Sequence, residues 1–86
     1  MDIRFTEKAL SEFLSMNKSI QLLFKKGIEK IIEHPLRRHL KYGIPYHVVN
    51  ITKQSRLIYS IKNDTIYIHH CFTQHKDYEN WYNSYK

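Results

Sequence analysis

Hydrophobic side chains in the first half of the chain recur at helical spacing after a short alternating segment. Residues 2–5 alternate polar and apolar side chains, which predicts a strand, and Thr6 can cap the helix that follows. A second helical period begins at Lys18, with an apolar side chain every three or four residues, and Pro35 ends it because proline lacks an amide hydrogen. We therefore expect a strand followed by a helical hairpin.

After Pro35 the hydrophobic period becomes that of strands. Gly43 and Pro45 separate a segment at 36–41 from one at 46–52. Two alternating runs follow, at 56–61 and 65–73, and the Asn63-Asp64 pair between them suits a tight hairpin turn. The second half is therefore predicted to be a meander of antiparallel strands.

The side chains of the last predicted strand divide by alternation into two sets. One set is Ile66, Ile68, His70 and Phe72, and the other is Tyr67, His69 and Cys71. From His75 the tail is predicted to form one or two helical turns. The fold class is α+β: an N-terminal strand and a helical hairpin packed on a twisted antiparallel sheet, with a short C-terminal helix. With helices on one face of the sheet, we expect the other face to be open, polar and basic.

Length and charge narrow the class of protein. The 86 residues suit one domain spanning 1–86, and 14 Lys and Arg against 8 Asp and Glu give a formal net charge of +6. Six basic and no acidic side chains fall within 34–62, which favours a polyanionic partner. The single cysteine, Cys71, allows no internal disulfide, and no apolar run suits a signal sequence or a membrane span. We expect a cytoplasmic protein.

The residue types in the second half suit the cleavage of RNA by its own 2′-hydroxyl group. That reaction needs a base, an acid and cations around the phosphate, and no metal. All six histidines follow residue 33: His34, His39, His47, His69, His70 and His75. His69, His70 and Cys71 are adjacent on a predicted strand, so successive side chains point to opposite faces, and no zinc-binding spacing is present. We therefore expect no metal and no cofactor.

Three residues are candidates for that chemistry, and each has an ordinary alternative. Arg56 opens a strand and could hold a phosphate, or it could be a solvated edge arginine. His75 follows the last strand and could be a general acid, or a helix-start histidine with no task. Tyr78 could stack on a base or orient the phosphate, or it could pack with Trp81 and Tyr82.

The densest group of basic residues comprises Arg37, Arg38 and Lys41. These side chains could bind RNA phosphates without reading its sequence. A solvated charged surface is the ordinary alternative.

Four segments together resemble the RelE/ParE superfamily of bacterial type II toxins, particularly its YoeB-like and YafQ-like branches. They are Pro35-Leu36-Arg37, Tyr46 to Thr52, Arg56-Leu57-Ile58-Tyr59 and His75-Lys76-Asp77-Tyr78. The resemblance implies a ribosome-dependent endoribonuclease that cleaves mRNA in the A site. It also implies inhibition by a cognate antitoxin in a hetero-oligomer.

The resemblance also implies roles for individual residues. Arg56 matches the arginine that stabilises the phosphate, His75 the C-terminal histidine that acts as general acid, and Tyr78 the C-terminal aromatic residue. His34 stands where YoeB-like members hold the glutamate base, with Glu33 beside it. A third candidate base is His47, near the start of the strand that carries a histidine in YafQ-like members. The paired basic residues that YoeB-like toxins place on that strand are Val49 and Asn50 here, so Arg37, Arg38, Lys41 and Lys53 would have to supply the positive charge.

Two other functions fit the same residues. A ParE-like toxin would share the fold and inhibit DNA gyrase without being a nuclease, because fold does not determine function. A non-catalytic RNA-binding module would need only the basic residues and the aromatic side chains.

Overall fold

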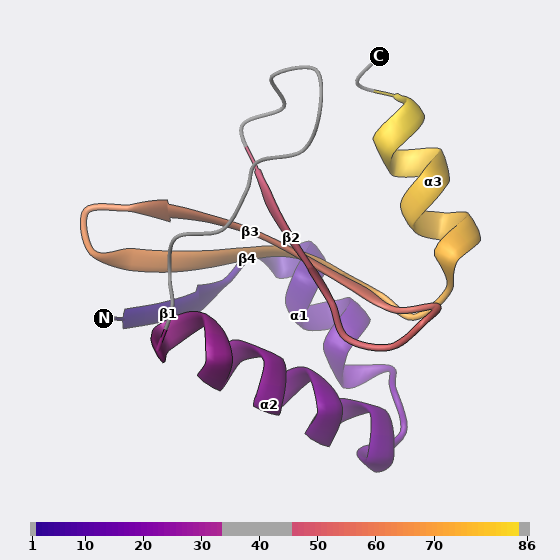
Figure 1. Cartoon of the computed structure of the whole chain (residues 1–86), viewed down its shortest axis with the longest axis horizontal. Helices are drawn as coiled ribbons and strands as arrows, with labels where there is room; N and C mark the ends of the chain where they lie inside the picture. The colour runs from indigo at the N-terminus through magenta and orange to yellow at the C-terminus, as the bar shows by residue number, and fades with distance from the viewer. Residues whose placement is uncertain (1, 34–45, 85–86) are drawn as a thin grey trace.

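The computed structural model describes residues 2–33 and 46–84 (Figure 1). Within them the chain forms β1 (Asp2–Phe5), α1 (Glu7–Leu14), α2 (Lys18–Glu33), β2 (His47–Asn50), β3 (Arg56–Lys62), β4 (Thr65–Phe72) and α3 (His75–Asn83). The expected segment at 36–41 lies outside the described residues. The predicted order of strand, helical hairpin, antiparallel strands and C-terminal helix is confirmed.

The ends of the helices follow from local side-chain chemistry. The Thr6 hydroxyl accepts a hydrogen bond from the Ala9 amide at 3.1 Å, so the predicted cap of α1 is confirmed. Asn17 does the same for α2, since its Oδ1 accepts from the Ile20 amide at 2.9 Å. α2 ends at Glu33, two residues before Pro35.

The four strands lie in the order β1-β4-β3-β2. β2 with β3, and β3 with β4, pair antiparallel, and Asn63 and Asp64 form the hairpin turn with φ of 50° and 60°. The predicted meander is confirmed. β1, however, runs parallel to β4 at the edge of the sheet. A parallel pair needs a long connection, and the two helices form part of the connection between these strands. The sheet is therefore mixed.

A β-bulge in β4 overturns the predicted division of its side chains. Ile58 pairs with His70 but Tyr59 pairs with Ile68, so His69 is an extra residue. The alternation shifts by one position beyond the bulge. Cys71 therefore joins Ile66 and Ile68 in the core, whereas His70 and Phe72 turn to the opposite face.

The core lies between one face of the sheet and the helices α1 and α2. Its buried members are Ala9, Phe13, Phe24, Ile28, Ile31, Leu57, Tyr59, Ile66, Ile68 and Cys71. α2 approaches the sheet closely at Gly27, where a Cβ atom would overlap Cδ1 of Ile51. In Figure 1, α1 and α2 lie on one side of the strands and α3 on the other.

Candidate active site

The face of the sheet opposite α1 and α2 is where α3 rests. Its described side chains alternate with the core residues of β3 and β4 and include Arg56, His70 and Phe72. Trp81 of α3 packs on this face, with its ring centroid 5.5 Å from that of His70 and 6.0 Å from that of Phe72. We expected this face to be open, polar and basic, but α3 covers part of it and its described surface there is largely aromatic and imidazole.

Arg56 lies at the start of β3 and fixes the turn that precedes it. Its Nη1 donates to the carbonyl oxygens of Thr52, Lys53 and Ser55 at 3.0, 3.1 and 3.0 Å. The side-chain hydrogen bonds that Arg56 makes among the described residues all leave from this nitrogen. The other nitrogens of the half-buried guanidinium group can therefore donate to an anion.

Tyr78 connects Arg56 to α3. The guanidinium carbon lies 5.7 Å from the centroid of the Tyr78 ring, within the range of a cation–π contact. Burial raises the pKa of the Tyr78 phenol; nearby Tyr82 raises it further, and Arg56 opposes the shift. The hydroxyl group therefore keeps its proton at neutral pH and can donate a hydrogen bond.

His75 is the first residue of α3 and lies beside Tyr78. The two ring centroids are 5.6 Å apart. Its Nδ1 lies 2.7 Å from Oε1 of Glu79, one helical turn further on. The His75 side chain is 38% exposed, so its other ring nitrogen can reach a ligand. Arg56, Tyr78 and His75 thus form one group of side chains, which we call the Arg56 group.

Lys53 belongs to the same corner of the molecule. It is exposed in the turn between β2 and β3, and its carbonyl oxygen accepts from Arg56. The backbone of a second cationic residue is thereby held beside the Arg56 group.

Two other sequence candidates, Glu33 and His47, do not join this group. Glu33 is exposed at the end of α2, which Figure 1 places across the molecule from the start of α3. His47 is only 7% exposed and stacks on the core residue Tyr59, with ring centroids 5.0 Å apart. A buried imidazole on the helix-covered face cannot contact RNA. His34, Arg37, Arg38 and Lys41 lie outside the described residues.

His69 is a polar residue to which the sequence analysis gave no role. It is the extra residue of the β4 bulge, and its Nε2 lies 2.7 Å from the Ser60 hydroxyl oxygen. Burial, with a smaller effect of His70, lowers the pKa of His69, so the imidazole is neutral at pH 7. Only the pair of adjacent histidines in the sequence could have signalled an unusual site here.

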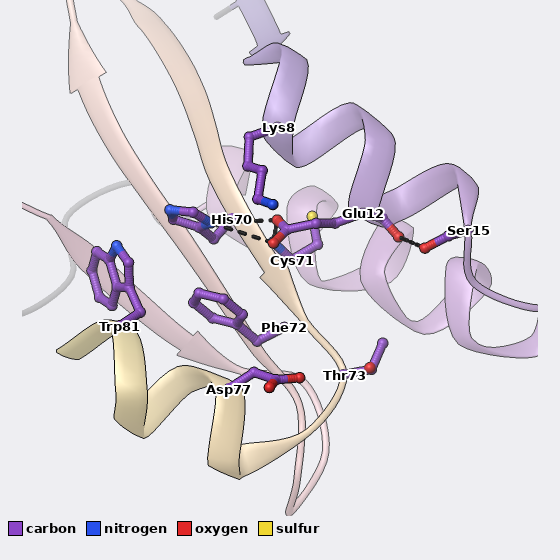
Figure 2. Close-up of a pocket in the computed structure, with 9 residues that line it drawn as sticks. All are labelled: Lys8, Glu12, Ser15, His70, Cys71, Phe72, Thr73, Asp77 and Trp81. Carbon is purple, nitrogen blue, oxygen red and sulfur yellow. Dashed lines mark hydrogen bonds and ion pairs between the residues drawn. The ribbon is translucent and has the colours of Figure 1, made fainter. Parts of the chain in front are cut away.

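A cavity of about 490 Å³ lies at the edge of β4, between α1 and α3 (Figure 2). β1 ends before this part of β4, and Glu12 of α1 takes its place: its carboxylate accepts from the Cys71 amide at 2.9 Å. His70 Nδ1 lies 3.4 Å from the same carboxylate group. No sequence pattern indicated this capping role of Glu12, because it depends on where β1 ends.

Two further properties bear on the class of protein. In the parts of the chain that the structure describes, no helix is long and apolar enough to cross a membrane. Within those same residues, no three His, Cys, Asp or Glu side chains gather as ligands for a metal ion.

Comparison with known proteins defines the fold. No family model and no curated protein matches the sequence. Among solved structures, the isolated E. coli RelE toxin is similar with a TM-score of 0.74 at 15% identity, over 99% of this chain and 98% of RelE. A chain of the intact E. coli RelBE toxin-antitoxin complex is similar with a TM-score of 0.72 at 17% identity, over 83% of this chain and 93% of that chain. The YoeB dimer from Staphylococcus aureus is similar with a TM-score of 0.72 at 18% identity, over 84% of this chain and 94% of the YoeB chain. The chain therefore has the RelE-like α+β fold that its sequence predicted.

Proposed function

We propose that this protein is the toxin of a type II toxin–antitoxin system and acts as a ribosome-dependent endoribonuclease on mRNA. The observation that carries the proposal is the Arg56 group. A guanidinium group, a neutral phenol and an imidazole meet beside the start of α3 in a RelE-like fold. A cation, a hydrogen-bond donor and a proton donor are what cleavage by the 2′-hydroxyl requires around the phosphate.

The proposed reaction is an internal transfer of the phosphate. A base removes the proton of the 2′-hydroxyl, and the 2′-oxygen attacks phosphorus while the bond to the 5′-oxygen breaks. Arg56 and Lys53 balance the negative charge that develops on the phosphate oxygens, and Tyr78 donates a hydrogen bond there. His75 gives its proton to the leaving 5′-oxygen. The products are a 2′,3′-cyclic phosphate and a free 5′-hydroxyl group.

Neither described candidate for the base of this reaction lies beside the Arg56 group. Glu33 lies across the molecule from it, and His47 is buried. His34 follows Glu33 directly in the chain, so the proposal assigns no base. Arg37, Arg38 and Lys41 are proposed to bind the RNA phosphates on sequence grounds alone.

The test is primer extension on an mRNA incubated with ribosomes and purified protein. We expect cleavage by the unchanged protein, and Arg56→Ala or His75→Ala should each slow it by about 100-fold or more. Lys62→Ala is the matched control, because Lys62 is an exposed cation at the opposite end of β3, and it should cleave normally. Full cleavage by both the Arg56 and the His75 variants would contradict the proposal.

Assays of translation, DNA breaks and RNA binding separate the two other functions. A gyrase inhibitor would leave mRNA and translation intact while DNA breaks accumulate, and a binding module would retain RNA without cutting it. Either result would replace the nuclease proposal.

We also propose that an antitoxin covers the outer surface of α1 and α2. Five large apolar side chains are 39–64% exposed there: Leu10, Leu14, Leu22, Leu23 and Ile32. The sequence placed four of them in the apolar stripes of the helices, and the sheet does not cover them. An amphipathic segment of an antitoxin could bury them, as helix-in-groove partners do. The structural similarity to RelE in the RelBE toxin-antitoxin complex supports a partner of this kind.

A further inference from the structure

The Arg56 group has a contact, between His75 and Glu79, that takes no part in the proposed reaction. Glu79 follows His75 by four residues on α3, and its Oε1 lies 2.7 Å from His75 Nδ1. The two side chains are 57% and 38% exposed. An exposed pair at this spacing adds little to the stability of a helix. The pair can nevertheless affect the chemistry of the His75 imidazole.

A carboxylate group can only accept a hydrogen bond, so it selects the imidazole form that carries a proton on Nδ1. With Nδ1 held in this way, Nε2 is the nitrogen that gains and loses a proton. The Tyr78 ring, 5.6 Å from that of His75, packs beside the imidazole and limits its rotation. Glu79 and Tyr78 therefore act together on the tautomer and the orientation of His75.

We infer that Glu79 is a positioning residue for His75, holding Nδ1–H so that Nε2 faces the scissile phosphate. The inference rests on the proposed nuclease function. In the reaction, the imidazolium group gives its Nε2 proton to the leaving 5′-oxygen as the phosphorus–oxygen bond breaks. The neutral imidazole that remains already has its proton on Nδ1, bonded to Glu79. No proton has to move between the ring nitrogens, and Glu79 keeps its charge throughout.

The tautomer can be measured without any substrate. Long-range ¹H–¹⁵N NMR spectra of the purified protein at about pH 9, where an ordinary imidazole is neutral, report which nitrogen of His75 carries the proton. We expect the Nδ1–H form in the unchanged protein and in Glu79→Gln, whose amide oxygen still accepts. Glu79→Ala should shift His75 toward the Nε2–H form that a free imidazole prefers in water. An Nε2–H form in the unchanged protein, or no shift in Glu79→Ala, would overturn the inference.

Single-turnover cleavage on ribosomes then tests the consequence. Glu79→Ala should lower the maximal cleavage rate about tenfold with little change in the affinity for ribosome-bound mRNA, because orientation of the acid is lost and RNA binding is not. Glu79→Gln should recover most of the rate. Asp77→Asn is the matched control: it removes a carboxylate charge from the same helix without touching the His75 bond, and it should cleave normally.

The two measurements fail independently. If the unchanged protein does not cleave mRNA, the proposed function falls, while the NMR result still decides whether Glu79 sets the tautomer. If the protein cleaves mRNA but Glu79→Gln is as slow as Glu79→Ala, the positioning role is wrong and the nuclease proposal stands.

Discussion

At the scale of single residues, the surroundings set the protonation state of each candidate. Burial keeps Tyr78 protonated, and a hydrogen bond to Glu79 orders His75. Burial and a neighbouring histidine keep His69 neutral. Glu79, Tyr82 and His70 act on residues within one helical turn or next to them in the chain, whereas Arg56 reaches Tyr78 from another element.

His69 gives a prediction for the dependence of stability on pH. Its pKa is lowered in the folded protein from an ordinary value of 6.5, so between these two values the unfolded chain binds more protons. The stability that a neutral His69 contributes is therefore complete above about pH 6.5 and is lost as the pH falls through the folded pKa. His69→Gln should lose less stability on acidification than the unchanged protein.

Urea unfolding at a series of pH values between about 8 and 5 measures this difference. Gln at position 69 can still bond the Ser60 hydroxyl group, so the comparison isolates the titration. Parallel curves for the two proteins would show that His69 does not contribute to the pH dependence.

At the scale of elements, packing positions depend on contacts between distant segments. α2 passes so close to the end of β2 that position 27 has no room for a side chain without displacing Ile51. The bulge at His69 similarly sets which side chains of β4 meet the helices and which meet α3. The first feature sets how close α2 lies to the end of β2, and the second sets the two faces of β4.

The contact between Gly27 and Ile51 predicts a coupled pair of substitutions. Gly27→Ala should gain about 1 kcal/mol of helix propensity but lose about 1–3 kcal/mol to overlap with Cδ1 of Ile51. Ile51→Val removes that carbon atom. The double variant should therefore be more stable than the sum of the single effects predicts, by about 1 kcal/mol. Denaturant unfolding of all four proteins measures the coupling, and strictly additive effects would contradict the packing argument.

At the scale of the whole molecule, two surfaces lie on different sides of the sheet. The exposed leucines belong to α1 and α2, and the Arg56 group lies where β3 begins and α3 starts. A partner bound to the leucines would thus leave the Arg56 group as a separate site. This separation allows each surface to be changed without altering the other.

The leucine surface gives the third prediction. Leu14 and Leu22 are 64% and 53% exposed, so replacing both with aspartate should leave the fold intact. Loss of about 1–2 kcal/mol of apolar burial at each position should weaken antitoxin binding by about 30-fold or more. Ribosome-dependent cleavage should not change. Isothermal titration with the neutralising antitoxin measures the Kd, and Ser19→Asp, at an exposed polar position of α2, is the control. Unchanged binding would place the antitoxin elsewhere.

The sequence by itself determined the features that depend on local chemistry, such as helix boundaries and turns. Thr6 and Pro35 mark helix boundaries, and Asn63 and Asp64 form a hairpin turn because their backbone tolerates positive φ. Hydrophobic periodicity predicted the order of strands and helices, and the α+β fold followed from that order. The sequence named Arg56, His75 and Tyr78 as candidates, and their side chains lie together in the structure.

The tertiary structure decided what depends on partners far apart in the chain. The parallel pairing of β1, the bulge at His69 and the capping of Cys71 by Glu12 each join segments that no local pattern connects. His47, a candidate base by its resemblance to a YafQ-like histidine, is buried against Tyr59. The alternation of side chains in the sequence reveals neither a bulged residue nor the face of the sheet that the helices cover. The physical reason is that burial and pairing are settled by the whole chain packing at once.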